Sequence, residues 1–475
     1  MTDSTLEELE IEETKRLNDG IELIASENYP SQDILDLLGS HFSVKYAEGF
    51  PKKISKQGRH YAGCEVIDKL EEYTIEKACE LFECNYANVQ PHSGSQANQA
   101  VYSGLLKPGD TVLGMGLEYG GHLTHFSKAS STGSIYNAFY YGLDENGELN
   151  YDEIKEKLEK HHPRLLVVGA SAYSKRIDYE RIRKIVDEYN ENLRNEYEIR
   201  ARNSEGGYEA VIDWYLDDEY KCYLMSDSAH VMGFIAAHLW KDKYNPLKWC
   251  DVVTSTTHKT LRGPRGGIIL WNDKNLCSKL NSGVFPKIQG GPNEALVAAK
   301  CQCFIEALRP SFRDYMEQVY INMQALINGI KKEDTEEKIK FIGGGSENHM
   351  VLINLRDTGI NGKQAEDLLT SYDIICNKNM MIGDSKPSKS SAIRVGTAAI
   401  TTRGFDENMC YELGRIMARI LLRKKNVVEN GVVDFEEQSI RPRLKKMLEK
   451  VGPFYKVEKQ SAINVVDFNP SDDPA

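Results

Sequence analysis

Short apolar runs that alternate with charged, amphipathic segments restrict the fold of this chain more than any other feature. Runs of strand length occur between residues 111 and 270: TVLGM, RLLVVGAS, CYLMSDSAH, DVVTSTTHK and GGIIL. Between some of them, YDEIKEKLEKHH and YERIRKIVDEY have the spacing of amphipathic helices. This alternation predicts an α/β fold with a largely parallel sheet. Ligands of such sheets bind beyond the carboxyl ends of the strands, so polar residues there are the first candidates for a site.

Changes in composition divide the chain into an arm and two domains. We expect an N-terminal helical arm at residues 1–45, a large α/β domain at 46–308 and a smaller α+β domain at 309–475. Residues 190–221 are polar, carry both charges and contain a Gly-Gly pair, which indicates an inserted surface excursion. The residues from about 464 to 475 have the composition of a loose tail.

Charge and apolar content argue against several classes of function. The formal net charge is −12, whereas a protein that neutralises nucleic-acid phosphates needs a basic surface. No apolar run approaches the roughly 20 residues that span a bilayer. The acidic segment MTDSTLEELEIEETKRL has the pattern of neither a signal peptide nor a transit peptide. The scattered cysteines contain no C-x-x-C pair, which favours reduced thiols over a metal site. We therefore expect a cytoplasmic protein without membrane or nucleic acid as its main partner.

The first polar constellation is QPHSGSQANQAV at residues 90–101, where Ser93, Gly94 and Ser95 lead into a helical pattern. A helix N-terminus has free N–H groups and the positive end of the helix dipole, so it can hold a phosphate. Ordinary capping of the helix by a serine is the open alternative.

Two further constellations contain Asp227, in LMSDSAHVMG, and Lys259, in TSTTHKTLRGPRGG. Asp227 either holds a ring nitrogen protonated or caps the next turn, and Lys259 is either a nucleophile or a solvated loop lysine. Together with the phosphate cup, they match the phosphate, the pyridine nitrogen and the aldehyde of one cofactor, pyridoxal phosphate. The three constellations therefore predict a pyridoxal-phosphate site with a Schiff base at Lys259.

Longer motifs resemble one family, the serine hydroxymethyltransferases. The similar runs, in the same order as in that family, are IELIASENYPS, KYAEGFP, YAGCE, YANVQPHSGSQAN, GGHLTH, SAYS, TSTTHKTLRGPRGG and IRVGTAAITTRGF. They extend over residues from about 15 to 420. The resemblance implies fold type I of the pyridoxal-phosphate enzymes, with a mostly parallel seven-stranded sheet. It also implies reversible transfer of the serine hydroxymethyl carbon to tetrahydrofolate, which yields glycine and 5,10-methylenetetrahydrofolate.

The resemblance assigns roles at the cofactor. It implies that Lys259 carries the cofactor, that Asp227 pairs with the pyridinium nitrogen and that His122 stacks on the ring. The implied phosphate contacts are Ser93, Gly94, Ser95 and His258, with Tyr46 and Gly291 reaching in from a second subunit. The residues implied beside the ring oxygen and the Schiff base are Ser171, His230 and Thr256. Arg265 is implied as the cation that keeps the lysine in position.

Substrate contacts follow from the same resemblance. Arg394 is implied as the partner of the substrate carboxylate, and Glu48 as the acid/base group near the hydroxymethyl carbon. The other implied substrate contacts are Ser26, Tyr46 and Tyr61, and the implied folate contacts are Leu117, Gly121, Leu123 and Asn379. Serine, glycine and tetrahydrofolate are the implied partners. Active sites shared between subunits imply a homodimer, and a tetramer stays open.

The loop between Glu48 and Tyr61 departs from the family pattern. It is longer, and it carries Lys52, Lys53, Lys56, Arg59 and His60. This basic loop either attracts the acidic polyglutamate tail of cellular folates or is simply solvated.

Two other functions stay open. A pyridoxal-phosphate lyase such as a threonine aldolase needs the same Lys259, Asp227 and Arg394. A catalytically inactive scaffold is expected to have lost one of these residues or Glu48, and all four are present.

Overall fold

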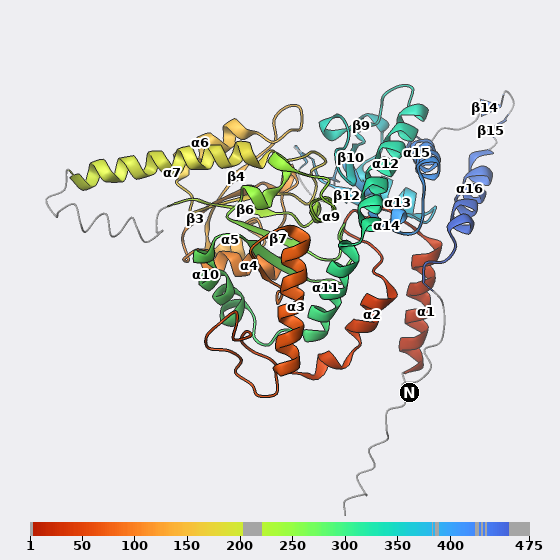
Figure 1. The fold of residues 1–475 in the computed structure, drawn as a ribbon. Coiled ribbons are helices and arrows are strands. Elements are labelled where there is room, and N and C mark those ends of the chain that lie inside the picture. Colours follow the sequence, from red (N-terminus) through yellow and green to blue (C-terminus); the bar gives the residue numbers. More distant parts are fainter. Residues whose placement is uncertain are drawn as a thin grey trace, which may run out of the picture.

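A seven-stranded sheet with helices on both faces forms the centre of the protein (Figure 1). The computed structural model describes residues 3–202, 221–381, 383–384, 389–422, 427–428, 431–432 and 435–455. The strand order is β2-β8-β7-β6-β5-β3-β4, and within this sheet only β8 (Gly267–Trp271) runs antiparallel to its neighbours. The other strands are β2 (Tyr86–Asn88), β3 (Thr111–Met115), β4 (Asn137–Tyr141), β5 (Leu165–Val168), β6 (Tyr223–Asp227) and β7 (Val252–Thr256). The predicted α/β fold with a mostly parallel seven-stranded sheet is confirmed.

The side chains of β5 show why helices cover both faces of the sheet. Leu165 and Val167 pack in one buried cluster with α4 (Gly94–Leu105) and α10 (Cys277–Ser282). Leu166 and Val168 pack in another buried cluster with α6 (Tyr151–His161) and α7 (Tyr179–Arg202). Successive side chains of a strand point to opposite faces, so an unbroken apolar run needs a layer on each side. Near β7 and β8 the covering helices are α3 (Glu65–Phe82), α9 (Met232–Ala236) and α11 (Glu294–Ala307).

Two strands of this sheet were not predicted. Strand β2 has only three residues, and β4 is an edge strand whose first residue, Asn137, is exposed and whose next three are half-buried. Strand β4 does contain the apolar run at residues 138–141, but this run is short and only its last residue is buried.

The predicted excursion at residues 190–221 is wrong at its start. Helix α7 runs from Tyr179 to Arg202 without a break. Its stripe of buried side chains continues through Ile182, Val186, Tyr189 and Leu193, which explains why the helix does not stop at residue 189. The Asn190 side chain donates to the Cys222 carbonyl at 3.1 Å and accepts from its N–H at 2.9 Å. Residues 203–220 and the expected tail at 464–475 lie outside the described residues.

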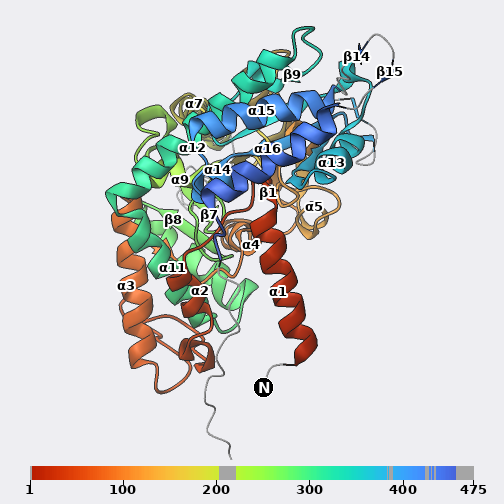
Figure 2. The same cartoon turned by 90° about the vertical axis from the view of Figure 1, so that its right-hand side faces the viewer.

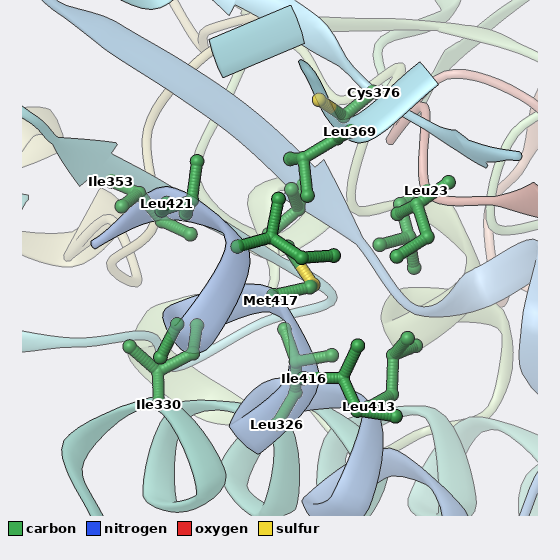
Figure 3. Close-up of a cluster of buried hydrophobic side chains, with 14 of the residues drawn as sticks. Leu23, Leu326, Ile330, Ile353, Leu369, Cys376, Leu413, Ile416, Met417 and Leu421 are labelled. Atoms are coloured by element: carbon green, nitrogen blue, oxygen red, sulfur yellow. The ribbon is translucent and has the colours of Figure 1, made fainter. Parts of the chain in front are cut away.

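A smaller antiparallel sheet has the order β12-β13-β10-β9. Its strands are β9 (Lys340–Phe341), β10 (Met350–Asn354), β12 (Asn377–Asn379) and β13 (Ala392–Gly396). Helices α12 (Pro310–Glu333) and α15 (Glu407–Leu421) cross it side by side, with α13 (Gly362–Thr370), α14 (Ala398–Thr402) and α16 (Phe435–Val451) around them (Figure 2). In the core between them, Leu326 of α12 lies near Leu413 and Met417 of α15 (Figure 3).

The N-terminal arm joins this second sheet. After α1 (Ser4–Asp19), β1 (Ile21–Glu22) pairs in parallel with β11 (Ile374–Ile375), and Leu23 belongs to the same buried core as Met417 (Figure 3). The Gly396 N–H donates to the Leu23 carbonyl at 2.8 Å, so the arm runs beside β13. None of the helices in the described part of the chain combines the length and apolarity needed to cross a membrane.

Candidate active site

Asp227 is the last residue of β6, and its carboxylate accepts hydrogen bonds from two other elements. One oxygen, Oδ2, accepts from Asn98 Nδ2 at 2.8 Å and lies 3.0 Å from His125 Nε2. The other accepts the Ala229 N–H at 3.1 Å, which is the capping role that the sequence left open. Burial raises the pKa of Asp227, but hydrogen bonding and charge from the histidines outweigh burial and hold this pKa below its usual value. The carboxylate is therefore ionised and suited to hold a ring nitrogen protonated.

Asn98 and His125 were not assigned a role from the sequence. Asn98 lies four residues after Gly94, on the same face of α4, and is buried although polar. His125 follows His122 by three residues and is equally buried. A buried polar residue beside a functional motif is the signal that could have identified both, because such groups need partners.

Lys259 follows β7, the strand next to β6, and is half-buried. Its Nζ donates to Thr256 Oγ1 at 3.1 Å. Burial lowers the pKa of Lys259 to about 8. The negative charge of Asp227 raises this pKa, whereas the positive charges of Arg394 and Arg265 lower it further. Near neutral pH a substantial fraction of this amine is unprotonated, which a Schiff-base nucleophile requires.

The N-terminus of α4 approaches β7 closely. Ser93 caps the helix, because its Oγ accepts the Gln96 N–H at 3.2 Å. A Cβ atom on Gly94 would lie 2.5 Å from Cγ2 of Thr256, so this approach needs a glycine. Ser95, in the first turn, is exposed. Capping and phosphate binding are compatible here, because the first N–H groups of a helix exceed what one cap can satisfy.

Three histidines around this cluster are held neutral. Burial lowers the pKa of His122, of His230 and, to about 3, of His258. The Nδ1 atoms of His230 and His258 are buried without a hydrogen-bond partner in the described part of the chain. Neutral imidazoles with a free nitrogen can donate to or accept from a ligand without adding charge.

Arg394 reaches this cluster from the second sheet. It lies at the centre of β13, a largely buried strand. Its Nε donates to Asn377 Oδ1 at 3.2 Å, and its Nη1 donates to the Ser171 carbonyl. Burial lowers the pKa of Arg394 to about 10, which leaves it charged, and this charge acts on Lys259 and His230. Ser26, half-buried, lies in the arm segment beside β13.

A second cluster holds the remaining substrate positions. The rings of Tyr46 and Tyr61 contact each other edge-on, with 5.0 Å between their centroids. The Tyr46 hydroxyl donates to Glu48 Oε1 at 3.3 Å. A Cβ atom on Gly291 would lie 3.1 Å from the Tyr46 ring, and one on Gly290 would lie 3.1 Å from Glu48 Oε1. No hydrogen bond or ion pair within the described residues joins this cluster to Lys259.

The expectation that Arg59 contributes to a basic surface is wrong. Arg59 is buried, and its guanidinium donates to Asp68 and Glu71 at 2.8 Å each. It also donates to the carbonyls of Ala47 and Gly49, the residues on either side of Glu48. Arg59 therefore orders the Glu48 loop, a role that its position in a lysine-rich run conceals. Lys53 is paired too, with Glu72.

The implied folate positions divide between two elements. Leu117, Gly121 and Leu123 lie on the loop after β3, where the two leucines are 42% and 52% exposed. Asn379 lies on β12 and donates to the Met380 carbonyl at 2.7 Å. Arg265, after β7, is exposed and acts on Lys259 through its charge.

The donor set fits pyridoxal phosphate. An ionised carboxylate, a lysine with a lowered pKa and a free helix N-terminus meet at the carboxyl ends of adjacent strands, and two buried imidazole nitrogens have no partner in the described chain. The carboxylate matches the ring nitrogen of the cofactor, the lysine matches its aldehyde, and the helix N-terminus matches its phosphate.

Comparison with known proteins gives one consistent result. The sequence model of serine hydroxymethyltransferase matches residues 1–196 and 205–417. A serine hydroxymethyltransferase of Francisella philomiragia is 45% identical over 421 residues, which are 88% of this chain and 91% of that protein. One of Prochlorococcus marinus is 41% identical over 453 residues, 95% of each chain. This chain belongs to the serine hydroxymethyltransferase family, the pyridoxal-phosphate enzymes of fold type I that transfer the hydroxymethyl carbon of serine reversibly to tetrahydrofolate.

Proposed function

We propose that the residues around Lys259 form the site at which this chain interconverts serine and glycine. The observation that carries this assignment is that the charges of Asp227, on one sheet, and of Arg394, on the other, both act on Lys259. A carboxylate, an amine of pKa about 8 and a guanidinium at one place are what an amino-acid substrate and pyridoxal phosphate require.

Each of these groups has a distinct task. The cofactor, when bound, supplies an electron sink for the substrate. Asp227, kept ionised by His125 and Asn98, holds the proton on the cofactor ring nitrogen. Lys259 holds the cofactor through its Nζ, next to the Thr256 hydroxyl. The neutral ring of His122 is the flat partner for the cofactor ring, and the N-terminus of α4 with His258 holds the phosphate.

Arg394 orients the amino-acid substrate. Its Nε and Nη1 are held by Asn377 and Ser171, which fix the plane of the guanidinium. A fixed fork can bind a carboxylate with two parallel hydrogen bonds, and burial strengthens both.

We also propose that the Tyr46–Tyr61–Glu48 cluster completes the site of a second copy in a homodimer. Tyr46 and Tyr61 are 53% and 46% exposed, and further exposed apolar side chains lie near them in sequence: Val44, Val66 and Tyr73. An exposed apolar set of this kind is typical of a subunit interface. Glu48 then moves a proton at the hydroxymethyl carbon of serine bound to the partner's lysine.

A complementation experiment tests the shared site. Lys259→Ala and Glu48→Gln homodimers should each be nearly inactive. Mixing and refolding the two should restore turnover, because one of the two sites in each hybrid then receives an intact Lys259 and an intact Glu48. Hybrids as inactive as the parents would contradict sharing.

The choice between the transferase and an aldolase-type lyase rests on folate. Purified protein should show the visible absorption band of a lysine-bound cofactor, and serine cleavage should rise strongly with tetrahydrofolate. Cleavage that is independent of tetrahydrofolate would favour the lyase, and absence of the band would exclude both.

A further inference from the structure

Helix α3 ends in a turn that brings two cysteines together. Glu83 adopts the left-handed conformation, with φ at 53°, and its N–H donates to the Cys79 carbonyl. The Cys84 N–H donates to the same carbonyl at 3.2 Å. A left-handed residue followed by a bond from the second residue past the helix to the fourth-last helical residue is the Schellman pattern. In this pattern the side chains of those two residues, here Cys84 and Cys79, contact each other.

The two thiols are in different environments. Cys79 is partly exposed, whereas Cys84 is 7% exposed and donates its thiol to the Tyr86 carbonyl at 3.5 Å. A hydrogen bond between the thiols lowers the pKa of Cys79, and together with burial it raises the pKa of Cys84. An accessible thiol that ionises more readily, beside a buried one, is the arrangement of an attacking and a resolving cysteine.

We propose that Cys79 and Cys84 form a reversible intramolecular disulfide, with a low-molecular-weight disulfide as the oxidant. The Cys79 thiolate attacks one sulfur of the oxidant, whose S–S bond breaks and releases one thiolate. The Cys84 thiol then loses its proton to solvent and attacks Cys79, which expels the second oxidant thiol. Two protein thiols are oxidised, and one small disulfide is reduced to two thiols.

Another close pair of cysteines does not share this geometry. Cys301 and Cys303 lie two residues apart on α11, where side chains diverge around the helix. Cys303 also donates its thiol to the Leu261 carbonyl at 3.4 Å. A helix end is therefore what makes the Cys79–Cys84 pair suitable, since the left-handed turn folds the chain back over the last turn of α3.

The proposed disulfide lies directly before strand β2. That strand leads to Gln90 and then to Ser93 at the start of α4. Oxidation is thus a covalent modification on the chain segment that connects α3 to the proposed phosphate-binding residues, away from Lys259 itself.

Mass spectrometry of the holoenzyme tests the proposal. The protein is incubated with glutathione disulfide, alkylated and digested with trypsin. Residues 78–128 form one peptide whose only cysteines are Cys79 and Cys84, because the Lys107–Pro108 bond resists trypsin. We expect this peptide to become lighter by two hydrogens, to carry no glutathione and to resist alkylation until dithiothreitol is added. Cys277, also partly exposed, serves as an internal control that should take only a glutathione adduct.

Two variants separate the roles of the cysteines. Cys84→Ser should accumulate glutathione on Cys79, because no resolving thiol remains, and Cys79→Ser should leave Cys84 unmodified. Wild-type protein whose two cysteines stay open to alkylation while Cys277 is modified would overturn the proposal, whatever the variants do. A stable glutathione adduct in the wild type, at the level of Cys84→Ser, would also overturn it.

Discussion

Lys259 and Lys300 are two lysines whose pKa values burial lowers, and only Lys259 has the surroundings that we propose for a catalytic group. Burial lowers the pKa of Lys259 to about 8 and that of Lys300 to about 7. Lys300, on α11, is fully buried and donates to the carbonyls of Val89 and Pro91 at 2.8 and 2.7 Å. Lys259 donates to a single hydroxyl, that of Thr256.

A lowered pKa therefore does not identify a nucleophilic lysine by itself. The Nζ of Lys300 donates to backbone carbonyls and lies near the carboxyl groups of Glu71 and Glu294, so it supports the segment between β2 and Ser93. Lys259 stands at the carboxyl ends of the strands beside groups that act on it through charge rather than by hydrogen bonds. Unused hydrogen-bonding capacity at a ligand-binding edge distinguishes it from Lys300.

The largest effect is expected from Lys259→Ala. Loss of the amine that holds the cofactor should lower kcat by roughly 10⁴-fold and remove the visible absorption band of the bound cofactor. Far-UV circular dichroism should remain that of the wild type, since Lys259 makes only one side-chain hydrogen bond in the described structure. Retention of the band would assign the cofactor to another lysine.

Lys300→Met should have the opposite profile. It leaves two buried carbonyls without their donor, so the free energy of unfolding should fall by about 4 kcal/mol. The folded fraction should still bind the cofactor and give its absorption band. Urea unfolding monitored together with the band measures both quantities, and a band lost without a loss of stability would contradict the distinction between the lysines.

Arg394 and Arg59 are two arginines for which we expect different effects on KM and kcat. Arg394→Ala should reduce kcat/KM for serine by roughly 100-fold, about 3 kcal/mol, mainly through a higher KM, because the carboxylate loses its partner. Arg59→Lys serves as the control: it keeps the charge but loses the fork to Ala47 and Gly49, so kcat should fall with little change in KM. Equal effects on KM in both variants would remove the distinction between binding and positioning.

The smallest effect concerns the pH dependence of the Lys300 surroundings. Burial, reinforced by Glu71, raises the pKa of Glu294 from 4.5 to about 8. The folded state therefore keeps a proton that the unfolded state has released, so stability falls as pH rises from about 5 towards 8. Between pH 5 and 6, below the pKa of about 7 of Lys300, Glu294→Gln should remove about 1 kcal/mol of this fall.

Thermal and urea unfolding at the two pH values check this prediction. Glu65→Gln, a change of an exposed glutamate on α3, is the matched control and should leave the pH dependence unchanged. Identical curves for Glu294→Gln and the wild type would show that Glu294 is ionised in the folded state.

Most of the α/β framework could be predicted because its strands are buried on both faces. β3, β5, β6, β7 and β8 have continuous apolar runs and lie where the sequence predicts them. The edge strand β4 has only a short apolar run with one buried residue, and α7 continues past residue 189 because its buried stripe does, although its surface there is highly charged.

The residues around the candidate site also divide into those that the sequence predicts and those that it does not. Asp227, Lys259 and Arg394, which we propose bind the cofactor and the substrate, stand in recognisable motifs at strand ends or within a strand, so residue type and position are enough to suggest a role for them. Asn98 and Arg59 do not stand in such motifs. Asn98 contacts Asp227, 129 residues away in the chain, and Arg59 contacts Glu71, 12 residues away. Only the folded chain reveals that these two side chains are bound to functional elements.

The amino-acid sequence by itself determined the α/β framework, the cofactor class and the family, because apolar periodicity and contiguous motifs are local properties of the chain. Tertiary structure alone decided which buried cations are free to act. Arg59 donates to two carboxylates and two carbonyls, Lys300 to two carbonyls and Lys259 to one hydroxyl. The acceptors of Lys300 come from a segment more than 200 residues away in the chain. Hydrogen-bond saturation depends on contacts between remote residues, which no local pattern encodes.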